Sequence, residues 1–330
     1  MKSWICPSFG ETPTLTDWPD PVAGPGEVVI DVAACGVNFA DTLILQGKYQ
    51  KRPKTAFAPG FEVSGIVQSV GDGVDNIAVG DRVMAMPDWG GYATRVVADA
   101  SLVIPLLGAV DFESAAAFQI AYGTSWFGLK YRANVQPGEV VLIHGAAGGV
   151  GLTAVECAKL LGATVIATAG GAEKCQIARD HGADHVIDYK SENIRDGVRE
   201  IAAKLGKPAG VDVVYDPIGG DIFDQSLRCV APGARMLLIG FASGIVPQIP
   251  ANILLVKNVT AIGFYFGAYL EQNPTIARQG MAEILGLLRE GKIRPMISAK
   301  YPLADAMDAL GAIRDRTATG KLIIDCRHIS

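Results

Sequence analysis

Short apolar runs separated by glycine, proline and aspartate dominate the first third of the chain. Within residues 26–110 these runs include GEVVIDVAACG, FEVSGIVQSVG and DRVMAM, each long enough for about one strand. Such spacing is typical of an all-β barrel or sandwich. Near Phe112 the pattern changes to an alanine-rich stretch with aromatic residues at helical spacing. We therefore expect a β-rich region that ends in a helix.

An alternation of strands and helices begins after Pro137-Gly138. The predicted strands are VVLIHG, TVIATA, DHVIDY, VDVVYD and ARMLLIG. Helical patterns lie between them, around 150–161, 173–181, 192–205 and 221–230. This order predicts an α/β domain with a doubly wound parallel sheet covered on both faces. Residues 259–267 (VTAIGFYFG) predict another strand, and the tail from 275 predicts two helices and a final strand, GKLIID.

Composition indicates a two-domain globular protein. The 330 residues exceed most single cores, and 49% hydrophobic with 19% charged residues is a globular balance. A net charge of −5 offers no broad basic surface for nucleic acid. The six cysteines are scattered without CxxC spacing, which indicates reduced, mostly buried thiols in a cytoplasmic protein.

No segment reads as a membrane or secretion signal. The first ten residues lack an apolar core of signal-peptide length. Residues 236–256 are uncharged, but two prolines, a glutamine and an asparagine interrupt them, which argues against a spanning helix. We expect no membrane partner.

A glycine-rich turn follows the strand VVLIHG and opens a helix. Ala146-Ala147-Gly148-Gly149-Val150-Gly151 matches the Rossmann fingerprint, with alanine at the first glycine position. Gly148 would let the backbone approach a pyrophosphate, Gly151 would let the helix pack closely, and the helix N-terminus would attract phosphate. The alternative is a plain strand-to-helix turn.

The next strand lacks the acid of an NAD-binding chain. A carboxylate that binds the adenosine ribose normally lies about 20 residues beyond the turn. Here that stretch is Thr168-Ala169-Gly170-Gly171, and Lys174 follows on the next helix. Room, a hydroxyl and a positive charge suit a 2′-phosphate, so the sequence favours NADP over NAD. The alternative for Lys174 is an ordinary exposed lysine.

Several further motifs carry a family resemblance along the whole chain. They are CGVNFADTLILQGKY, PGFEVSGIVQSVGDGV, GDRV, GGYAT, GAAGGVGL, HGADHVIDY, VDVVYDPIGG and RTATGKLII. The chain resembles the zinc-independent, zeta-crystallin-like quinone oxidoreductases of the medium-chain dehydrogenase/reductase superfamily. This implies a GroES-like catalytic domain from both chain ends (1–124 and 264–330), a Rossmann domain (125–263) and an active site in the cleft between them.

The resemblance also implies cofactor contacts. Lys174, Tyr189 and Arg316 match residues that surround the 2′-phosphate of NADPH in relatives. Thr124, Gly240, Phe241, Ser243, Phe264 and Phe266 match cofactor-proximal positions, although core or interface packing is the alternative for the two phenylalanines. NADPH is therefore the expected cofactor.

Comparison with zinc-dependent relatives implies no metal. Their motifs read CGVC and GHE, whereas this chain has Asn38 in the first and Gly60-Phe61-Glu62 in the second. Asparagine and phenylalanine are not zinc ligands of this type. A metal-free site suits hydride transfer to a conjugated acceptor, whose developing charge spreads to a remote oxygen.

Three residues are candidates for the chemistry. Tyr49, after a QGxY-like stretch, would donate a proton or anchor a carbonyl, as proposed for related enoyl-thioester reductases; the alternative is a loop tyrosine. Asn38 and Asp41 would line the nicotinamide or substrate site, with capping of a helix start as the alternative. His144 is interpreted as a packed, hydrogen-bonded residue.

The leading hypothesis is an NADPH-dependent reductase of quinones or α,β-unsaturated carbonyls. An enoyl-thioester reductase, an NAD(P)-linked alcohol dehydrogenase and a catalytically weak NADPH-binding structural or sensor protein remain alternatives. The partner is a small-molecule electron acceptor. The apolar strand 259–267 would leave a free sheet edge, and relatives pair such edges, so we expect a homodimer or a dimer-based tetramer.

Overall fold

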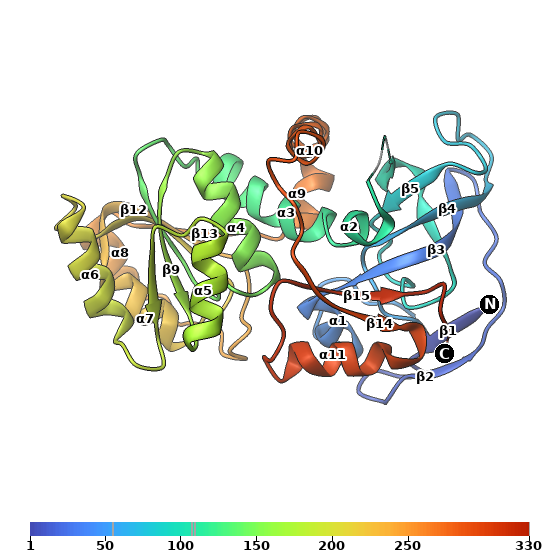
Figure 1. The fold of residues 1–330 in the computed structure, drawn as a ribbon, viewed down its shortest axis with the longest axis horizontal. Helices are drawn as coiled ribbons and strands as arrows, with labels where there is room; N and C mark the ends of the chain where they lie inside the picture. Colours follow the sequence, from blue (N-terminus) through green and yellow to red (C-terminus); the bar gives the residue numbers. More distant parts are fainter. Residues whose placement is uncertain (55, 107, 109, 330) are drawn as a thin grey trace. The chain divides into compact units, whose positions relative to one another are not determined.

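The computed structural model describes residues 1–54, 56–106, 108 and 110–329, and its chain divides into two units (Figure 1). The first contains residues 1–120 and 294–330, and the second contains residues 121–293. The units therefore meet at 120/121 and 293/294, whereas the domain boundaries expected from the sequence were 124/125 and 263/264.

Glu283 explains why residues 264–293 belong to the second unit. It lies on α10 (Pro274–Arg289) and accepts hydrogen bonds from Trp126 Nε1 at 2.9 Å, Lys130 Nζ at 2.8 Å and the Tyr131 hydroxyl at 2.9 Å. One carboxylate thus ties α10 to the segment that enters the Rossmann-like sheet. Such long-range contacts are not visible in local sequence patterns.

The first unit is built around strand β3. Its main sheet has the order β14-β15-β3-β4-β5-β7, with β6 also paired to β3, and β14 and β15 are its only parallel neighbours within the described chain. A separate antiparallel pair contains β1 (Lys2–Ile5) and β2 (Thr14–Asp17). The main strands are β3 (Glu27–Val37), β4 (Val63–Val70), β5 (Arg82–Ala85), β6 (Arg95–Asp99), β7 (Val103–Pro105), β14 (Ile297–Pro302) and β15 (Lys321–Asp325).

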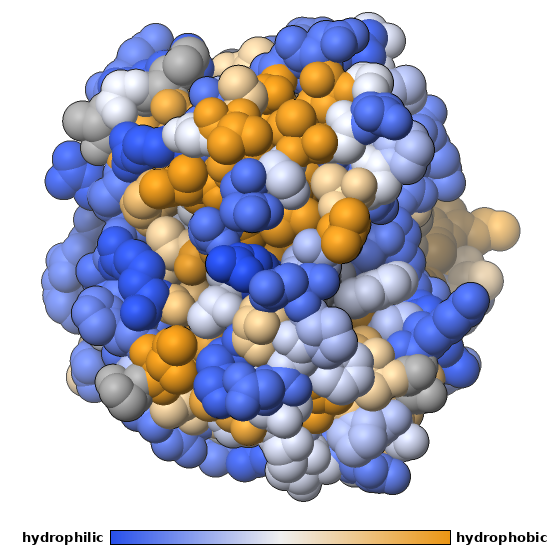
Figure 2. All heavy atoms as spheres, turned by 90° about the vertical axis from the view of Figure 1, so that its right-hand side faces the viewer, coloured by the Kyte–Doolittle hydropathy of each residue, from blue (hydrophilic) through white to orange (hydrophobic). Residues whose placement is uncertain are grey.

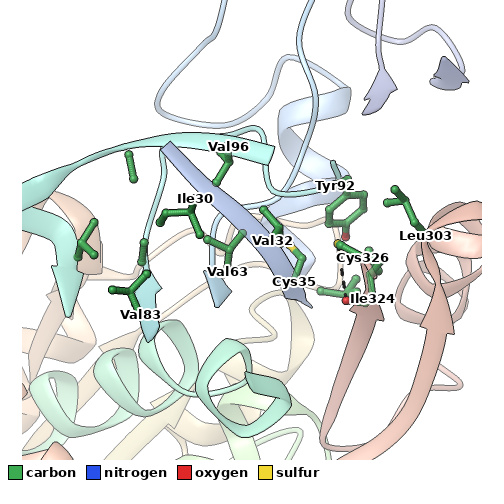
Figure 3. Packing of buried hydrophobic residues seen from close by; sticks show 14 of the residues in the cluster. Ile30, Val32, Cys35, Val63, Val83, Tyr92, Val96, Leu303, Ile324 and Cys326 are labelled. Atoms are coloured by element: carbon green, nitrogen blue, oxygen red, sulfur yellow. Dashed lines mark hydrogen bonds between the residues drawn. The ribbon is translucent and has the colours of Figure 1, made fainter. Parts of the chain in front are cut away.

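The inward-facing residues of β3 change phase along the strand. Val28, Ile30 and Val32 enter the core with a period of two, and the next core residue is Cys35. The register with β4 shifts between Val32 and Ala34, and a bulge of this kind moves the alternation by one residue. Figure 3 shows Ile30, Val32 and Cys35 in one cluster with residues of the C-terminal segment, including Cys326. Both chain ends therefore share one core.

Short helices complete the first unit. They are α1 (Phe39–Leu45), α2 (Phe112–Ala116) and α11 (Ala306–Arg314), with 3₁₀ turns at Ala100–Leu102 and Leu303–Asp305. In Figure 2, most apolar side chains of the visible face gather in its upper half, with hydrophilic side chains around and between them. Exposed apolar residues of this unit, such as Val22 and Val79, are ordinary for a protein surface when they occur singly.

The second unit is a doubly wound α/β sheet. Its six parallel strands have the order β10-β9-β8-β11-β12-β13, and they are β8 (Val140–Ile143), β9 (Thr164–Ala169), β10 (His185–Asp188), β11 (Val211–Asp216), β12 (Val230–Leu238) and β13 (Thr260–Gly263). In Figure 1, α4 (Gly149–Leu160) and α5 (Ala172–Asp180) cover one face. The other face carries α6 (Ile194–Lys204), α7 (Asp221–Leu227) and α8 (Ala251–Lys257). The predicted fold class is confirmed.

Two entry and exit segments flank this sheet. Helix α3 (Gln119–Trp126) continues into a π-helical turn, Phe127–Arg132, and α9 (Phe266–Gln272) precedes α10. The strand expected over 259–267 is therefore shorter, because Phe264 and Phe266 turn into an aromatic cluster with Phe127. Among the described residues, we find no helix with the length and apolar character needed to cross a membrane.

A histidine–carboxylate pair connects α4 with the end of α5. His181 Nδ1 lies 2.6 Å from Glu156 Oε1, and the other Glu156 oxygen accepts from the hydroxyl of Tyr122. The hydrogen bond to Glu156 raises the pKa of His181 above its ordinary value, against the opposing effect of burial. His181 therefore binds its proton more tightly in the folded chain than in the unfolded chain.

The stability of this unit should depend on pH through His181. Because the folded pKa is raised, the pair's contribution is fully present below about pH 6.5 and is lost as pH rises through the folded value. We expect His181→Gln to lower the urea midpoint at pH 6 and to lower it less at pH 9. His185→Gln is the control, since His185 makes no ion pair within the described chain. An equal loss at both pH values would contradict the assignment.

Candidate functional site

The carboxyl ends of the parallel strands place the predicted cofactor residues of the second unit at one sheet edge. The glycine-rich turn leaves β8 there, and Gly148 is the N-cap of α4. The ends of β9, β10, β11 and β12 face the same edge because all these strands are parallel. Open α/β sheets bind their ligands at this edge.

Gly148 and Gly151 in the turn lack a side chain for different reasons. A Cβ on Gly151 would lie 2.2 Å from the Gly145 carbonyl oxygen, so close packing of α4 on the turn excludes a side chain. A Cβ on Gly148 would meet only that oxygen, at an ordinary 3.4 Å, and its φ of −87° suits any residue. Neither packing nor backbone strain explains Gly148. A ligand that closely approaches the backbone, as a pyrophosphate does, explains it.

The end of β9 lies against the end of β10. A Cβ on Gly170 would lie 2.5 Å from the Tyr189 hydroxyl, so the tyrosine ring rests on the glycine. Asp188 Oδ1 accepts a hydrogen bond from the Gly171 amide at 2.8 Å. Lys174 lies in the first turn of α5, where burial, with neighbouring positive charge, lowers its pKa. Gly170 and Tyr189 are thus in contact, and Lys174 follows in the next helix; their role as a phosphate pocket stays a prediction.

Thr168 lies beside His144. Its hydroxyl lies 2.9 Å from His144 Nδ1, and His144 Nε2 lies 2.7 Å from the Ser226 hydroxyl, which itself donates to the Ile222 carbonyl. Ser226 therefore accepts from Nε2, and Thr168 donates to Nδ1. Burial lowers the pKa of His144, which keeps the ring neutral. The Thr168 hydroxyl is thus bonded to His144, while its expected contact with a phosphate stays a prediction.

Gly240, Phe241 and Ser243 follow β12 at the same edge. Their loop is held by backbone hydrogen bonds to the end of β11, such as Ser243 N–H to the Ile218 carbonyl at 3.0 Å. Asp216 ends β11 and is buried; its Oδ1 accepts from the Ile218 and Gly219 amides, while Oδ2 has no hydrogen-bond partner in the described part of the chain. This leaves one buried acceptor at the edge where a ligand would bind.

Thr124, Phe264 and Phe266 are less accessible. Thr124 is buried on α3. Phe266 packs against Phe127 with ring centroids 5.5 Å apart, and a Cβ on Gly123 would lie 2.3 Å from its ring. Core packing therefore accounts for the two phenylalanines.

In the first unit, Asn38 belongs to a buried polar network. Its Nδ2 donates to Glu62 Oε1 at 2.9 Å and its Oδ1 accepts from Lys321 Nζ at 2.7 Å. Lys321 also forms an ion pair with Glu62 and donates to the Val37 carbonyl. The second Glu62 oxygen accepts from the Ile120 amide at 3.0 Å. The network fixes the orientation of the Asn38 amide.

Asp41 is a structural residue. Its carboxylate is fully buried and accepts from the Asn38 amide at 2.8 Å, the Gly60 amide at 2.9 Å and the Tyr92 hydroxyl at 3.1 Å. Burial raises its pKa to about 7, although the hydrogen bonds oppose this. These contacts cap α1 and anchor the loop at Gly60. These contacts favour the capping alternative for Asp41.

Tyr49 lies in the N-terminal segment of the first unit, and Arg316 lies in its C-terminal segment. Tyr49 follows α1 in a bend and is partly exposed, and its ring centroid is 4.9 Å from that of Phe61. Arg316 follows α11 with a left-handed φ of 58°. Phe61 thus supports the Tyr49 ring at the position where zinc-dependent relatives carry histidine.

The positions of the two zinc motifs hold a different chemistry. Asn38, Phe61 and Glu62 occupy them, and the Asn38 amide and the Glu62 carboxylate bond to each other and to Lys321. Within the described residues, no group of three or more histidine, cysteine, aspartate or glutamate side chains could hold a metal ion. All six cysteines are buried and unpaired. Sequence reasoning missed Lys321, and a lysine at the head of the apolar strand GKLIID was its one available signal.

Comparisons with known proteins agree with this architecture. Residues 24–108 match the alcohol dehydrogenase GroES-like domain, and residues 149–283 match the zinc-binding dehydrogenase family. Over 310 residues the chain is 40% identical to quinone oxidoreductase-like protein 2 of Bos taurus, covering 94% of this chain and 87% of that protein. A quinone oxidoreductase of Pseudomonas syringae superposes with a TM-score of 0.91 at 33% identity, over 98% and 99% of the two chains. Escherichia coli quinone oxidoreductase complexed with NADPH gives 0.90 at 31%, over 98% and 100%.

Removal of Lys321 should destabilise the first unit strongly. Lys321→Met leaves the buried Glu62 carboxylate without its cation, and breaking a buried pair costs about 3–5 kcal/mol. Lys300→Met on β14 is the control, because its pair with Glu113 is half exposed and contributes less than about 1 kcal/mol. Urea unfolding of both variants measures the difference. Similar small losses would show that the Glu62 pair is not essential, and the double variant with Glu62→Gln should recover part of the loss.

Proposed function

The chain belongs to the zinc-independent quinone oxidoreductases of the medium-chain dehydrogenase/reductase superfamily, and from this premise we propose that it is an NADPH-dependent reductase of quinones or α,β-unsaturated carbonyls. The observation that carries the proposal is the combination of a phosphate-binding sheet edge with non-ligating residues at the zinc-motif positions. Membership makes the chain an oxidoreductase; the acceptor class is the proposed part.

NADPH is the cofactor that fits the second unit. When bound it supplies the hydride. Gly148 opens the backbone to the pyrophosphate, and the α4 N-terminus supplies free amides and a partial positive charge. Gly170, Lys174 and Tyr189 line the proposed 2′-phosphate pocket at the end of β9, where the strand itself ends without the acid that binds the ribose in NAD-binding chains. Two solved relatives, from Escherichia coli and a mycobacterium, are complexes with NADPH.

The first unit favours conjugated acceptors. A simple ketone or alcohol needs strong polarisation of its oxygen, which zinc-dependent relatives obtain from the metal. Here Lys321 and Glu62 hold the Asn38 amide in one orientation, and Phe61 supports Tyr49. These groups can orient an acceptor and donate one hydrogen bond. That is sufficient where the developing charge is delocalised over a quinone or an enone.

A substrate panel tests the proposal. NADPH oxidation should be fast with quinones or with 2-alkenals and enones, and slow with simple ketones, with and without a chelator. Turnover confined to enoyl thioesters would move the chain to the enoyl-thioester reductases. Tight NADPH binding with no turnover on any acceptor would favour a structural or sensor protein. Chelator-sensitive ketone reduction would overturn the metal-free assignment.

Tyr49→Phe tests the proton-donor role. Loss of a positioned acid lowers turnover by about 10²–10⁴-fold, whereas loss of one neutral hydrogen bond costs about 1 kcal/mol, or several-fold. We expect the larger effect with enones and a smaller one with quinones, which can take a proton from water, while the Kd of NADPH stays nearly constant. Tyr301→Phe on β14 is the control. Unchanged turnover with both acceptor classes would leave Tyr49 with a packing role only.

We also propose that the chain assembles as a homodimer or a dimer-based tetramer. Strand β13 is the edge of its sheet in the described chain, and the neighbouring α8 exposes Leu255 and Val256 by 77% and 75%. An unpaired edge beside exposed aliphatic residues is an association surface.

Light scattering at micromolar concentration should therefore give at least twice the chain mass. Leu255→Glu with Val256→Glu should shift the population toward monomer, because burial of four carboxylates per dimer is unfavourable. The matched change Ile66→Glu with Val79→Glu, on exposed residues of the first unit, should leave the mass unchanged. A wild-type monomer would contradict the proposal.

A further inference from the structure

A second lysine reaches the turn at the end of β9. Lys190 follows Tyr189 at the end of β10, and its Nζ lies 3.7 Å from the position that a Cβ on Gly171 would occupy. The Lys190 side chain therefore lies over Gly170-Gly171, the turn that leads into α5 and Lys174. Sequence comparison drew attention to Lys174 and Tyr189 and not to Lys190.

The backbone of Lys190 is anchored to this turn. Asp188 Oδ1 accepts from the Gly171 amide at 2.8 Å and from the Lys190 amide at 3.0 Å. One carboxylate oxygen thus binds both loops, and it holds them at a fixed separation. The amide hydrogen bonds lower the pKa of Asp188, so the carboxylate stays ionised in this role. These hydrogen bonds therefore fix the backbone of Lys190 relative to Gly171.

Positive charge is concentrated at this turn. Lys190 is the cation whose charge, after burial, contributes to the lowered pKa of Lys174, with Glu173 acting in the opposite direction. The charge of Lys190 also contributes to the lowered pKa of Asp188, so this carboxylate offsets part of the positive charge. An anionic ligand bound beside both lysines would reduce their mutual repulsion further. A dianionic phosphate matches the pair in charge.

We infer that Lys190 is a second cationic contact for the adenosine 2′-phosphate of NADPH, acting beside Lys174. The inference rests on the proposed function only in taking NADPH as the cofactor. It adds a specificity-determining residue: NADH, which lacks this phosphate, gains nothing from Lys190. The Asp188 carboxylate acts through Lys190 and is a positioning residue.

Lys190→Gln tests the inference through binding, without turnover. The Kd values of NADPH and NADH are measured by fluorescence of the reduced nicotinamide, and adenosine 2′-monophosphate serves as a competitor. We expect the Kd of NADPH to rise about tenfold, the effect of losing one charge-assisted hydrogen bond, and that of NADH to change less than about twofold. Lys190→Arg should retain most of the NADPH affinity. Raised ionic strength should bring the Kd values of NADPH and NADH for the wild-type protein closer together, because salt screens the charges.

Lys204→Gln is the matched control. Lys204 lies on α6 of the same unit, is 70% exposed and pairs with Glu200, so its loss changes net charge equally without touching the turn. If Lys190→Gln and Lys204→Gln raised the Kd of NADPH equally, Lys190 would act only through the overall electrostatic field of the protein. A wild-type protein without preference for NADPH would overturn the cofactor itself. A strong wild-type preference that Lys190→Gln leaves intact would overturn only the role of Lys190.

Discussion

A carboxylate that is wholly removed from water must be matched by charge and hydrogen bonds, and Glu62 imposes this constraint on the first unit. Its two oxygens take up the ammonium of Lys321, the amide of Asn38 and the backbone N–H of Ile120. These partners come from β15, the residue before α1, and Ile120 at the end of the first segment of this unit. The network therefore joins both chain segments of the first unit, and the loop that carries Tyr49 follows directly after α1.

A second carboxylate organises the cofactor edge of the other unit by a different route. An NAD-binding sheet ends its second strand with an acid that faces the ribose. In this chain the acid comes at the end of the following strand, as Asp188, and bonds to the amides of Gly171 and Lys190. Asp188 thus stabilises the turn through its hydrogen bonds, and in the proposed site Lys174 and Lys190 face the ligand. An acid placed one strand further along the chain is then compatible with NADPH.

Local periodicity was sufficient for most of the architecture. The alternation after Pro137 predicted the parallel sheet, and the AxGxxG spacing predicted the turn before α4. The bond between the Thr168 hydroxyl and His144 could not be predicted, because it forms between two strands. The Lys321–Glu62 pair joins residues 259 positions apart. No local pattern reports such a pair, and the burial that makes it important exists only in the folded chain.

The construction of the first unit from both ends of the chain has a consequence for biosynthesis. During translation, β3, β4 and Glu62 are synthesised well before β15 and Lys321. Residues 121–293 form a contiguous unit that can fold in the interval. Until translation reaches Lys321, Glu62 cannot be buried as an ion and β3 keeps an unpaired edge. The second unit can therefore be complete before the core of the first unit is closed.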